Sequence, residues 1–108
     1  MKKILKIIKS KNKKTLVCLT AYSKPFAKIL DKQCDIVLVG DSLGTAMLGM
    51  KNTHHVNIET MIRHGISVKS NLLNALCVID MPANSYNSVD MAKKNARLIF
   101  NKTQCDAV

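Results

Sequence analysis

Three short, uninterrupted apolar runs constrain the fold of this chain more than any other feature of its sequence. They lie within residues 16–20, 34–41 and 75–80. Each run is continuous rather than alternating, which is typical of parallel strands that are covered on both faces. A segment with helical periodicity follows each run, and this alternation predicts an α/β fold with a parallel sheet and right-handed crossovers.

The segments that follow these runs carry the usual signs of helices and loops. Helical periodicity is found in residues 23–33, 56–73 and 88–102. The side chains that suit the N-cap positions of these helices are Ser23, Asn57 and Ser88. In the first helix Phe26, Ile29 and Leu30 share an apolar face. Residues 45–55 and 81–88 are predicted loops, since they combine glycine, asparagine, serine and proline between the periodic segments.

The length and composition indicate one small domain. The chain has 108 residues, of which 47% are hydrophobic, and this is enough for a single packed core. We find no Gly/Ser linker and therefore predict one domain over residues 1–108, with a basic N-terminal helix at 1–14 and βα units over 15–108. The final residues, 105–108, indicate the start of a fourth strand.

The charge of the chain raises two alternatives to an enzyme. The formal net charge is +10, and seven of the 17 basic residues lie within positions 1–14. The other basic residues are scattered, without an arginine cluster or interleaved aromatics, which favours a solvated surface over a nucleic-acid site. No segment is long enough to span a bilayer, and no signal peptide is recognisable. The basic amphipathic helix leaves two roles open, contact with a membrane surface and capping of the domain.

The cysteines and histidines do not suggest a transition-metal site. The four cysteines are Cys18, Cys34, Cys77 and Cys105. They form no Cys-x-x-Cys pair and have no zinc-ligand spacing to histidine, so we expect small buried hydrophobes in a reducing cytoplasm. His54 and His55 lie in a predicted loop and His64 on a predicted helix, and all three are expected to be surface or packing residues.

Two aspartates end predicted strands and form the strongest candidate site. Asp41 ends the second strand and Asp80 ends the third. Because the carboxyl ends of parallel strands meet at one edge of the sheet, neighbouring strands would bring both carboxylates together. Mg²⁺ accepts one or two protein carboxylates with water and substrate as further ligands, and Ser42 could bind an anionic substrate beside it. The alternative is that each aspartate only forms the turn after its strand.

Several segments resemble a known family. The sequences LTAYSKPFAKILD, DIVLVGDSLG, MIRHGISV, IDMPANSY and NARLI occur in this order. Together they closely resemble the ketopantoate hydroxymethyltransferase family, from Leu19 to the last residue. The resemblance implies a (β/α)₈ TIM-type barrel, of which this chain would supply an incomplete N-terminal portion of about three and a half βα units.

The resemblance also implies a reaction and its site. The family transfers a hydroxymethyl group from 5,10-methylenetetrahydrofolate to the keto acid 3-methyl-2-oxobutanoate, giving ketopantoate for pantothenate biosynthesis. It implies Mg²⁺ bound by Asp41 and Asp80, and keto acid bound by Asp41, Ser42 and Asp80. It further implies homo-oligomers and an N-terminal helix that closes one end of the barrel.

This chain departs from the family in ways that bear on activity. The general base of the family is a glutamate in a later part of the barrel, so no catalytic residue is assigned here and the chain is expected to be inactive alone. The family usually has aspartate at Ser23, proline at His55, and Phe-Gly at Ala83 and Asn84. Two other readings stay open: a non-enzymatic half-barrel that pairs with another chain, and a small basic nucleic-acid-binding protein.

Overall fold

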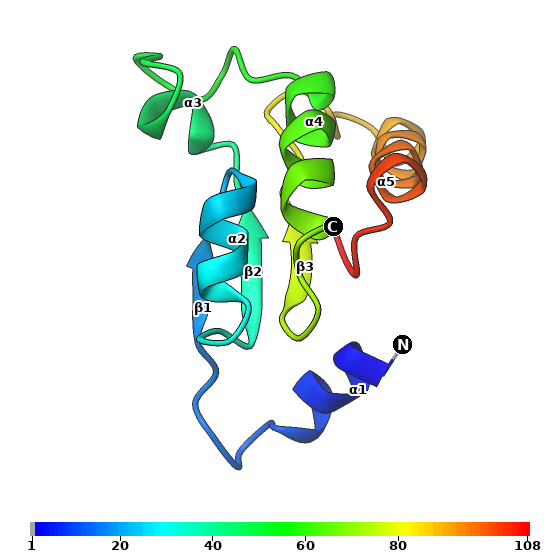
Figure 1. Cartoon of the computed structure of the whole chain (residues 1–108). Helices are drawn as coiled ribbons and strands as arrows, with labels where there is room; N and C mark the ends of the chain where they lie inside the picture. The colour runs from blue at the N-terminus through cyan, green and yellow to red at the C-terminus, as the bar shows by residue number, and fades with distance from the viewer. Residues whose placement is uncertain (1) are drawn as a thin grey trace.

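A single parallel sheet organises the chain, as the sequence predicts (Figure 1). The computed structural model describes residues 2–108. Its elements in chain order are α1 (Lys2–Lys9), β1 (Cys18–Thr20), α2 (Lys24–Leu30), β2 (Ile36–Val39), α3 (Leu43–Ala46), α4 (Ile58–Lys69), β3 (Leu76–Ile79) and α5 (Val89–Thr103). The strands have the spatial order β1-β2-β3, and both pairs are parallel. None of the helices within residues 2–108 has the length and apolar character that a membrane crossing needs.

The two faces of the sheet differ in burial. Val37 pairs with Cys77 and Val39 with Ile79, and all four side chains are fully buried. They face α4, because a Cβ on Gly65 of that helix would touch the side chain of Ile79. Alternate residues of a strand point to opposite faces, so Ile36, Leu38 and Val78 point away from the helices. These three side chains are only half-buried.

Strand β1 is exposed along its whole length, at Cys18, Leu19 and Thr20. It pairs with β2 on one side, and no other strand of residues 2–108 lies on its other side. The expectation that all strands are covered on both faces is therefore wrong for β1. The expectation that all four cysteines are buried is confirmed for Cys77 and Cys105, but it is wrong for the exposed Cys18 and for Cys34, which is only partly buried.

The helices begin mostly where the sequence places them. Asn57 Oδ1 accepts a hydrogen bond from Thr60 N at 2.9 Å, and this confirms the predicted cap of α4. Ser88 caps α5 in the same way through the N–H of Met91. Ser23 occupies the N-cap position of α2, but its side chain makes no capping hydrogen bond.

The buried face of α2 is not the apolar face that the sequence suggests. Ala27 is its buried residue, while Phe26 is 62% exposed and Ile29 is 63% exposed. The sheet and α4 cover only the side of α2 that carries Ala27. The larger apolar side chains of α2 are exposed instead.

The N-terminal helix lies below the sheet, at the amino ends of the strands (Figure 1). It ends at Lys9, short of the predicted position 14, and residues 10–13 form a turn. Lys3 Nζ donates a hydrogen bond to Ala75 O at 2.9 Å, just before β3 begins. Lys14 forms a 2.6 Å ion pair with Asp35, just before β2. These contacts favour the capping role over a free basic arm.

Asp31 joins the end of α2 to the start of β3. The residue is 6% exposed, and its carboxylate accepts hydrogen bonds from Asn74 N, Asn74 Nδ2 and Ala75 N at 2.8, 2.8 and 3.0 Å. A buried carboxylate needs such donors to replace its water. The contact therefore fixes the position at which β3 begins.

The far edge of β3 carries the beginning of a further strand. Ala107 forms an isolated parallel bridge with Val78, and Ile79 N donates to Ala107 O at 3.1 Å. Asp106 is held there by a 2.6 Å ion pair with Lys69. The predicted start of a fourth strand at residues 105–108 is confirmed, and the sheet continues in the parallel sense.

Candidate functional site at the carboxyl edge of the sheet

Asp41 and Asp80 lie side by side where β2 and β3 end. Val39 and Ile79 are paired across the two strands, and Asp80 N donates to Val39 O at 2.9 Å. Asp80 Oδ2 lies 3.5 Å from Asp41 N, at the long limit of a hydrogen bond. Both residues are partly exposed. The structure thus brings together the two aspartates that the sequence predicts to meet at one edge.

Helix α3, which the sequence analysis describes only as part of a loop, shapes the chain after Asp41. Gly44 N donates to Asp41 O at 2.9 Å, and Leu43 is fully buried. A Cβ on Gly44 would lie 2.6 Å from Val56 Cγ2, so only glycine allows this turn to pack so closely. The short helix holds Ser42 beside the strand ends. Four residues of helix are too few for a periodic signal, which explains why the element is missed.

A tyrosine connects Ser42 to the end of the first strand. The hydroxyl groups of Tyr22 and Ser42 share a hydrogen bond of 2.8 Å. His64 Nδ1 lies 2.6 Å from Tyr22 O, and since a carbonyl oxygen only accepts, the ring nitrogen donates. His64 is therefore a packing residue of α4, as expected. Tyr22 and Ser42 are 20 positions apart in the sequence, and Tyr22 and His64 are 42 apart. No local pattern in the sequence predicts either contact.

The donor atoms at this edge suit a hard divalent cation. Two carboxylates at adjacent strand ends supply oxygen ligands, and Mg²⁺ is held in proteins by one or two carboxylates with water and substrate completing its shell. Within residues 2–108 no group of three or more histidine, cysteine, aspartate or glutamate side chains is close enough to share a metal. Asp41 and Asp80 could supply at most two protein ligands to such an ion, with water and substrate as the others.

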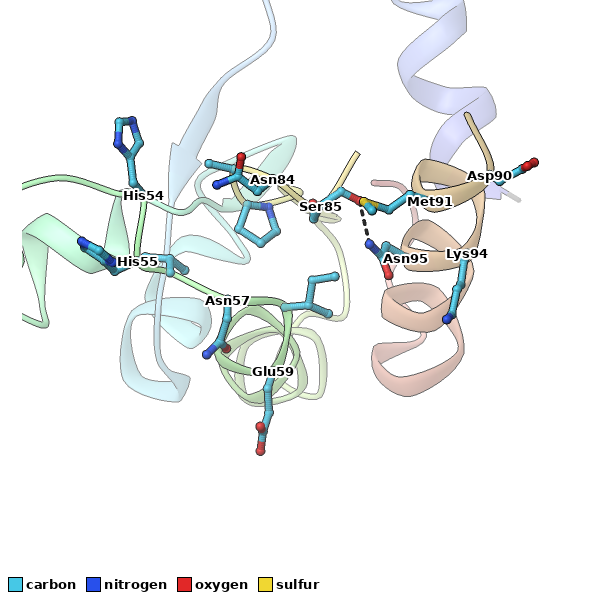
Figure 2. A pocket seen from close by; sticks show the side chains of 14 residues that line it. His54, His55, Asn57, Glu59, Asn84, Ser85, Asp90, Met91, Lys94 and Asn95 are labelled. Atoms are coloured by element: carbon cyan, nitrogen blue, oxygen red, sulfur yellow. Dashed lines mark hydrogen bonds between the residues drawn. The ribbon is translucent and has the colours of Figure 1, made fainter. Parts of the chain in front are cut away.

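An open cavity of about 780 Å³ lies next to this edge, between the starts of α4 and α5 (Figure 2). Asn95 Nδ2 donates to Ser85 O at 2.6 Å across its wall. Its lining includes His55, Ala83 and Asn84. Asn84 has φ of 64°, a left-handed conformation that asparagine tolerates. Asp41 and Asp80 do not line this cavity.

Comparison of the sequence with known proteins identifies relatives of this chain. The sequence model of the family described as ketopantoate hydroxymethyltransferase matches residues 1–108. A protein of Pelagibacter ubique named 3-methyl-2-oxobutanoate hydroxymethyltransferase is 48% identical over 107 residues, which cover 99% of this chain and 42% of that protein. Proteins with the same name from Anaplasma marginale and from Chelativorans are each 47% identical, and the matches cover 38% and 37% of their lengths.

The chain thus spans about two fifths of the length of these relatives, at their N-terminal part. The family model matches residues 1–108, and these relatives are 47–48% identical to the chain. The chain belongs to the ketopantoate hydroxymethyltransferase family.

Proposed function

We propose that Asp41, Ser42 and Asp80 form the keto-acid and Mg²⁺ part of a hydroxymethyltransferase active site. The reaction is transfer of a hydroxymethyl group from 5,10-methylenetetrahydrofolate to 3-methyl-2-oxobutanoate, giving ketopantoate. The observation that carries the proposal is the position of the Asp80 carboxylate, 3.5 Å from Asp41 N at the carboxyl edge of a parallel sheet. Sites of parallel α/β folds lie at this edge.

Each residue of the edge has a distinct task in this proposal. Asp41 and Asp80 would hold Mg²⁺ and face the keto acid, and Ser42 would bind the substrate carboxylate through its N–H and hydroxyl. Tyr22 would orient that hydroxyl through their 2.8 Å hydrogen bond. When bound, Mg²⁺ would supply Lewis-acid stabilisation of negative charge on the keto oxygen.

The reaction also needs a group that this chain does not provide. The carbon next to the ketone must lose a proton, and a general base has to lie within hydrogen-bond reach of it. We assign no residue of this chain to that role and place the base in the polypeptide that corresponds to the rest of the relatives. The complete unit would be a TIM-type barrel that forms homo-oligomers. A cytoplasmic location is supported by four unpaired cysteines.

Cation binding tests the metal assignment directly. Titration of Mn²⁺, observed by its paramagnetic broadening of amide signals, should locate the ion at residues 39–42 and 79–81. We expect Asp41→Asn and Asp80→Asn to weaken binding at least about tenfold, since each removes a charged oxygen ligand. Asp90→Asn, an exposed carboxylate on α5, is the matched control and should bind as the unchanged chain does.

Equal affinity of the unchanged chain and the Asp80→Asn variant would contradict the metal assignment. Turnover provides a second test, with keto acid, Mg²⁺ and 5,10-methylenetetrahydrofolate added to this chain alone. We expect no ketopantoate, because the base is missing. Robust product would refute the placement of the base in the remaining polypeptide.

A further inference from the structure

We propose that His64 is a positioning residue for Ser42 and that it acts through Tyr22. The hydrogen bond by which His64 packs against Tyr22 also fixes the tyrosine hydroxyl, and that hydroxyl in turn fixes the hydroxyl of Ser42. The part of this role that concerns keto-acid binding rests on the function proposed above for Ser42. The contacts that lead from His64 to Ser42 belong to the fold alone and can be tested without substrate.

The connection from β1 to α2 provides the first observation. Residues 21–23 belong to no helix or strand, and α2 begins without a side-chain cap. Ala21 N still bonds the neighbouring strand at 3.0 Å, but regular structure does not extend to Tyr22. His64 supplies a constraint there, because its Nδ1–H donates to Tyr22 O at 2.6 Å. The ring thus anchors the backbone of the residue whose hydroxyl reaches Ser42.

The packing of α4 provides the second observation. Met61 and Val68 of this helix are fully buried, and Gly65, the residue next to His64, lies directly against Ile79. The helix packs against both α2 and β3. Because tightly packed side chains leave a helix little freedom to shift, α4 is a fixed support for the half-buried ring of His64. From this support the ring reaches the start of α2.

The side chain of Ser42 provides the third observation. Its hydroxyl shares a 2.8 Å hydrogen bond with the hydroxyl of Tyr22. Ser42 Oγ also lies close to Gly40, where an added Cβ would come within 3.1 Å of it. A serine side chain has three staggered positions, and the bond with Tyr22 selects one of them. A shift of Tyr22 therefore frees the Ser42 hydroxyl to rotate, and the proposed keto-acid site loses a defined contact.

The hydrogen bond to Tyr22 O also determines the tautomer of His64. A neutral imidazole carries one proton, and the nitrogen that donates a hydrogen bond must hold it. We therefore expect neutral His64 to carry its proton on Nδ1 and none on Nε2. ¹⁵N NMR of the ring nitrogens distinguishes the two tautomers. This measurement uses the unchanged chain and needs neither a variant nor a ligand.

A double-mutant cycle tests whether His64 acts through Tyr22. His64→Leu removes the donor, Tyr22→Phe removes the hydroxyl, and the Hα–Hβ couplings of Ser42 report the position of its side chain. Each single variant should change these couplings from those of one dominant rotamer toward an average. In the Tyr22→Phe background, His64→Leu should add no further change, because the hydroxyl that it positions is already absent. A ring that only fills space would give additive changes.

Binding of 3-methyl-2-oxobutanoate in the presence of Mg²⁺ provides the functional readout. Tyr22→Phe and His64→Leu should each lower the affinity about three- to tenfold, which is the range for one neutral hydrogen bond. His64→Asn keeps an N–H donor near the position of Nδ1 and should restore most of the affinity.

His54→Leu is the matched control. It makes the same change at a histidine in an exposed loop, so the affinity and the Ser42 couplings should match those of the unchanged chain. Circular dichroism should show that the variants keep the fold. If His64→Leu does not fold, His64→Asn and the tautomer of the unchanged chain still decide the outcome.

Three results would overturn the proposal. One is a neutral His64 ring with its proton on Nε2, since Nδ1 could then not donate to Tyr22 O. Another is a folded His64→Leu chain whose Ser42 couplings equal those of the His54→Leu control. The third is a double variant whose changes are the sum of the single changes. Failure of the unchanged chain to bind keto acid is a separate result, because it would contradict the function proposed for Ser42 while the NMR couplings still decide the role of His64.

Discussion

Replacement of Asp31 by alanine should destabilise the fold by about 3 kcal/mol, because its carboxylate joins α2 to β3 through three hydrogen bonds. Ala75 is 1% exposed, so its N–H would be left buried without a partner, at about 1–3 kcal/mol. Asn74 is exposed, and its two donors would find water, so each lost bond costs only about 0.5–1.5 kcal/mol. The sum is a large share of the roughly 5–15 kcal/mol of a typical domain.

Urea unfolding followed by circular dichroism measures this loss. The midpoint should fall for Asp31→Ala, while the dependence on urea concentration stays the same. Asp90→Ala serves as control, since Asp90 is an exposed carboxylate in the first turn of α5 and contributes less than about 1 kcal/mol there. If Asp31→Ala unfolds within about 1 kcal/mol of this control, the hydrogen-bonded link does not carry the stability derived for it.

The same carboxylate gives the prediction a pH dependence. Burial raises the pKa of Asp31, but the hydrogen bonds from Ala75 and Asn74 outweigh burial and hold the pKa below its ordinary value of 3.8. Since the pKa is lower in the folded state, the stabilisation is present above pH 4 or so and is lost as the pH falls through the folded-state pKa. The difference between the unchanged chain and Asp31→Ala should therefore narrow in acid. A difference that stays constant down to pH 2 or so would contradict the assignment.

Two further predictions concern the core behind the site. Gly65→Ala should destabilise the chain by about 1–3 kcal/mol in urea unfolding, because the added methyl group would collide with Ile79. Alanine normally favours a helix over glycine, so a variant more stable than the unchanged chain would disprove the close packing of α4 on β3. Iodoacetamide at pH 8 should label Cys18 in the folded chain and Cys77 only after unfolding, because burial raises the pKa of Cys77 to about 12. Mass spectrometry that finds both thiols labelled at one rate would contradict this order.

The order of the elements could be predicted from the sequence because each depends on local pattern. Continuous apolar runs identify β2 and β3, and the capping side chains of Asn57 and Ser88 identify the starts of α4 and α5. The meeting of Asp41 and Asp80 follows from the same pattern, since parallel neighbours with helical crossovers end at one edge. This part of the candidate site needed no information beyond strand order.

What the sequence did not reveal depends on contacts between distant residues. The exposure of Phe26 and Ile29 follows from which side of α2 its neighbours cover, and an apolar stripe alone does not say whether a partner is present. The hydrogen bond between Tyr22 and Ser42 and the packing of His64 join separate βα units. Helix α3 is too short for periodicity to reveal. In each case packing decides the outcome, and packing has no local signature.

The contacts around Ser42 carry a consequence for how such a polypeptide is made. The hydrogen bonds of Tyr22 with Ser42 and His64, and the contact of Asp80 with Asp41 N, all form within positions 22–80. Nothing after position 80 contributes to them. A ribosome releases the chain from its N-terminus, so the carboxyl edge around Asp41, Ser42 and Asp80 can form before any later segment is synthesised. Extension of the sheet can then follow as a separate step.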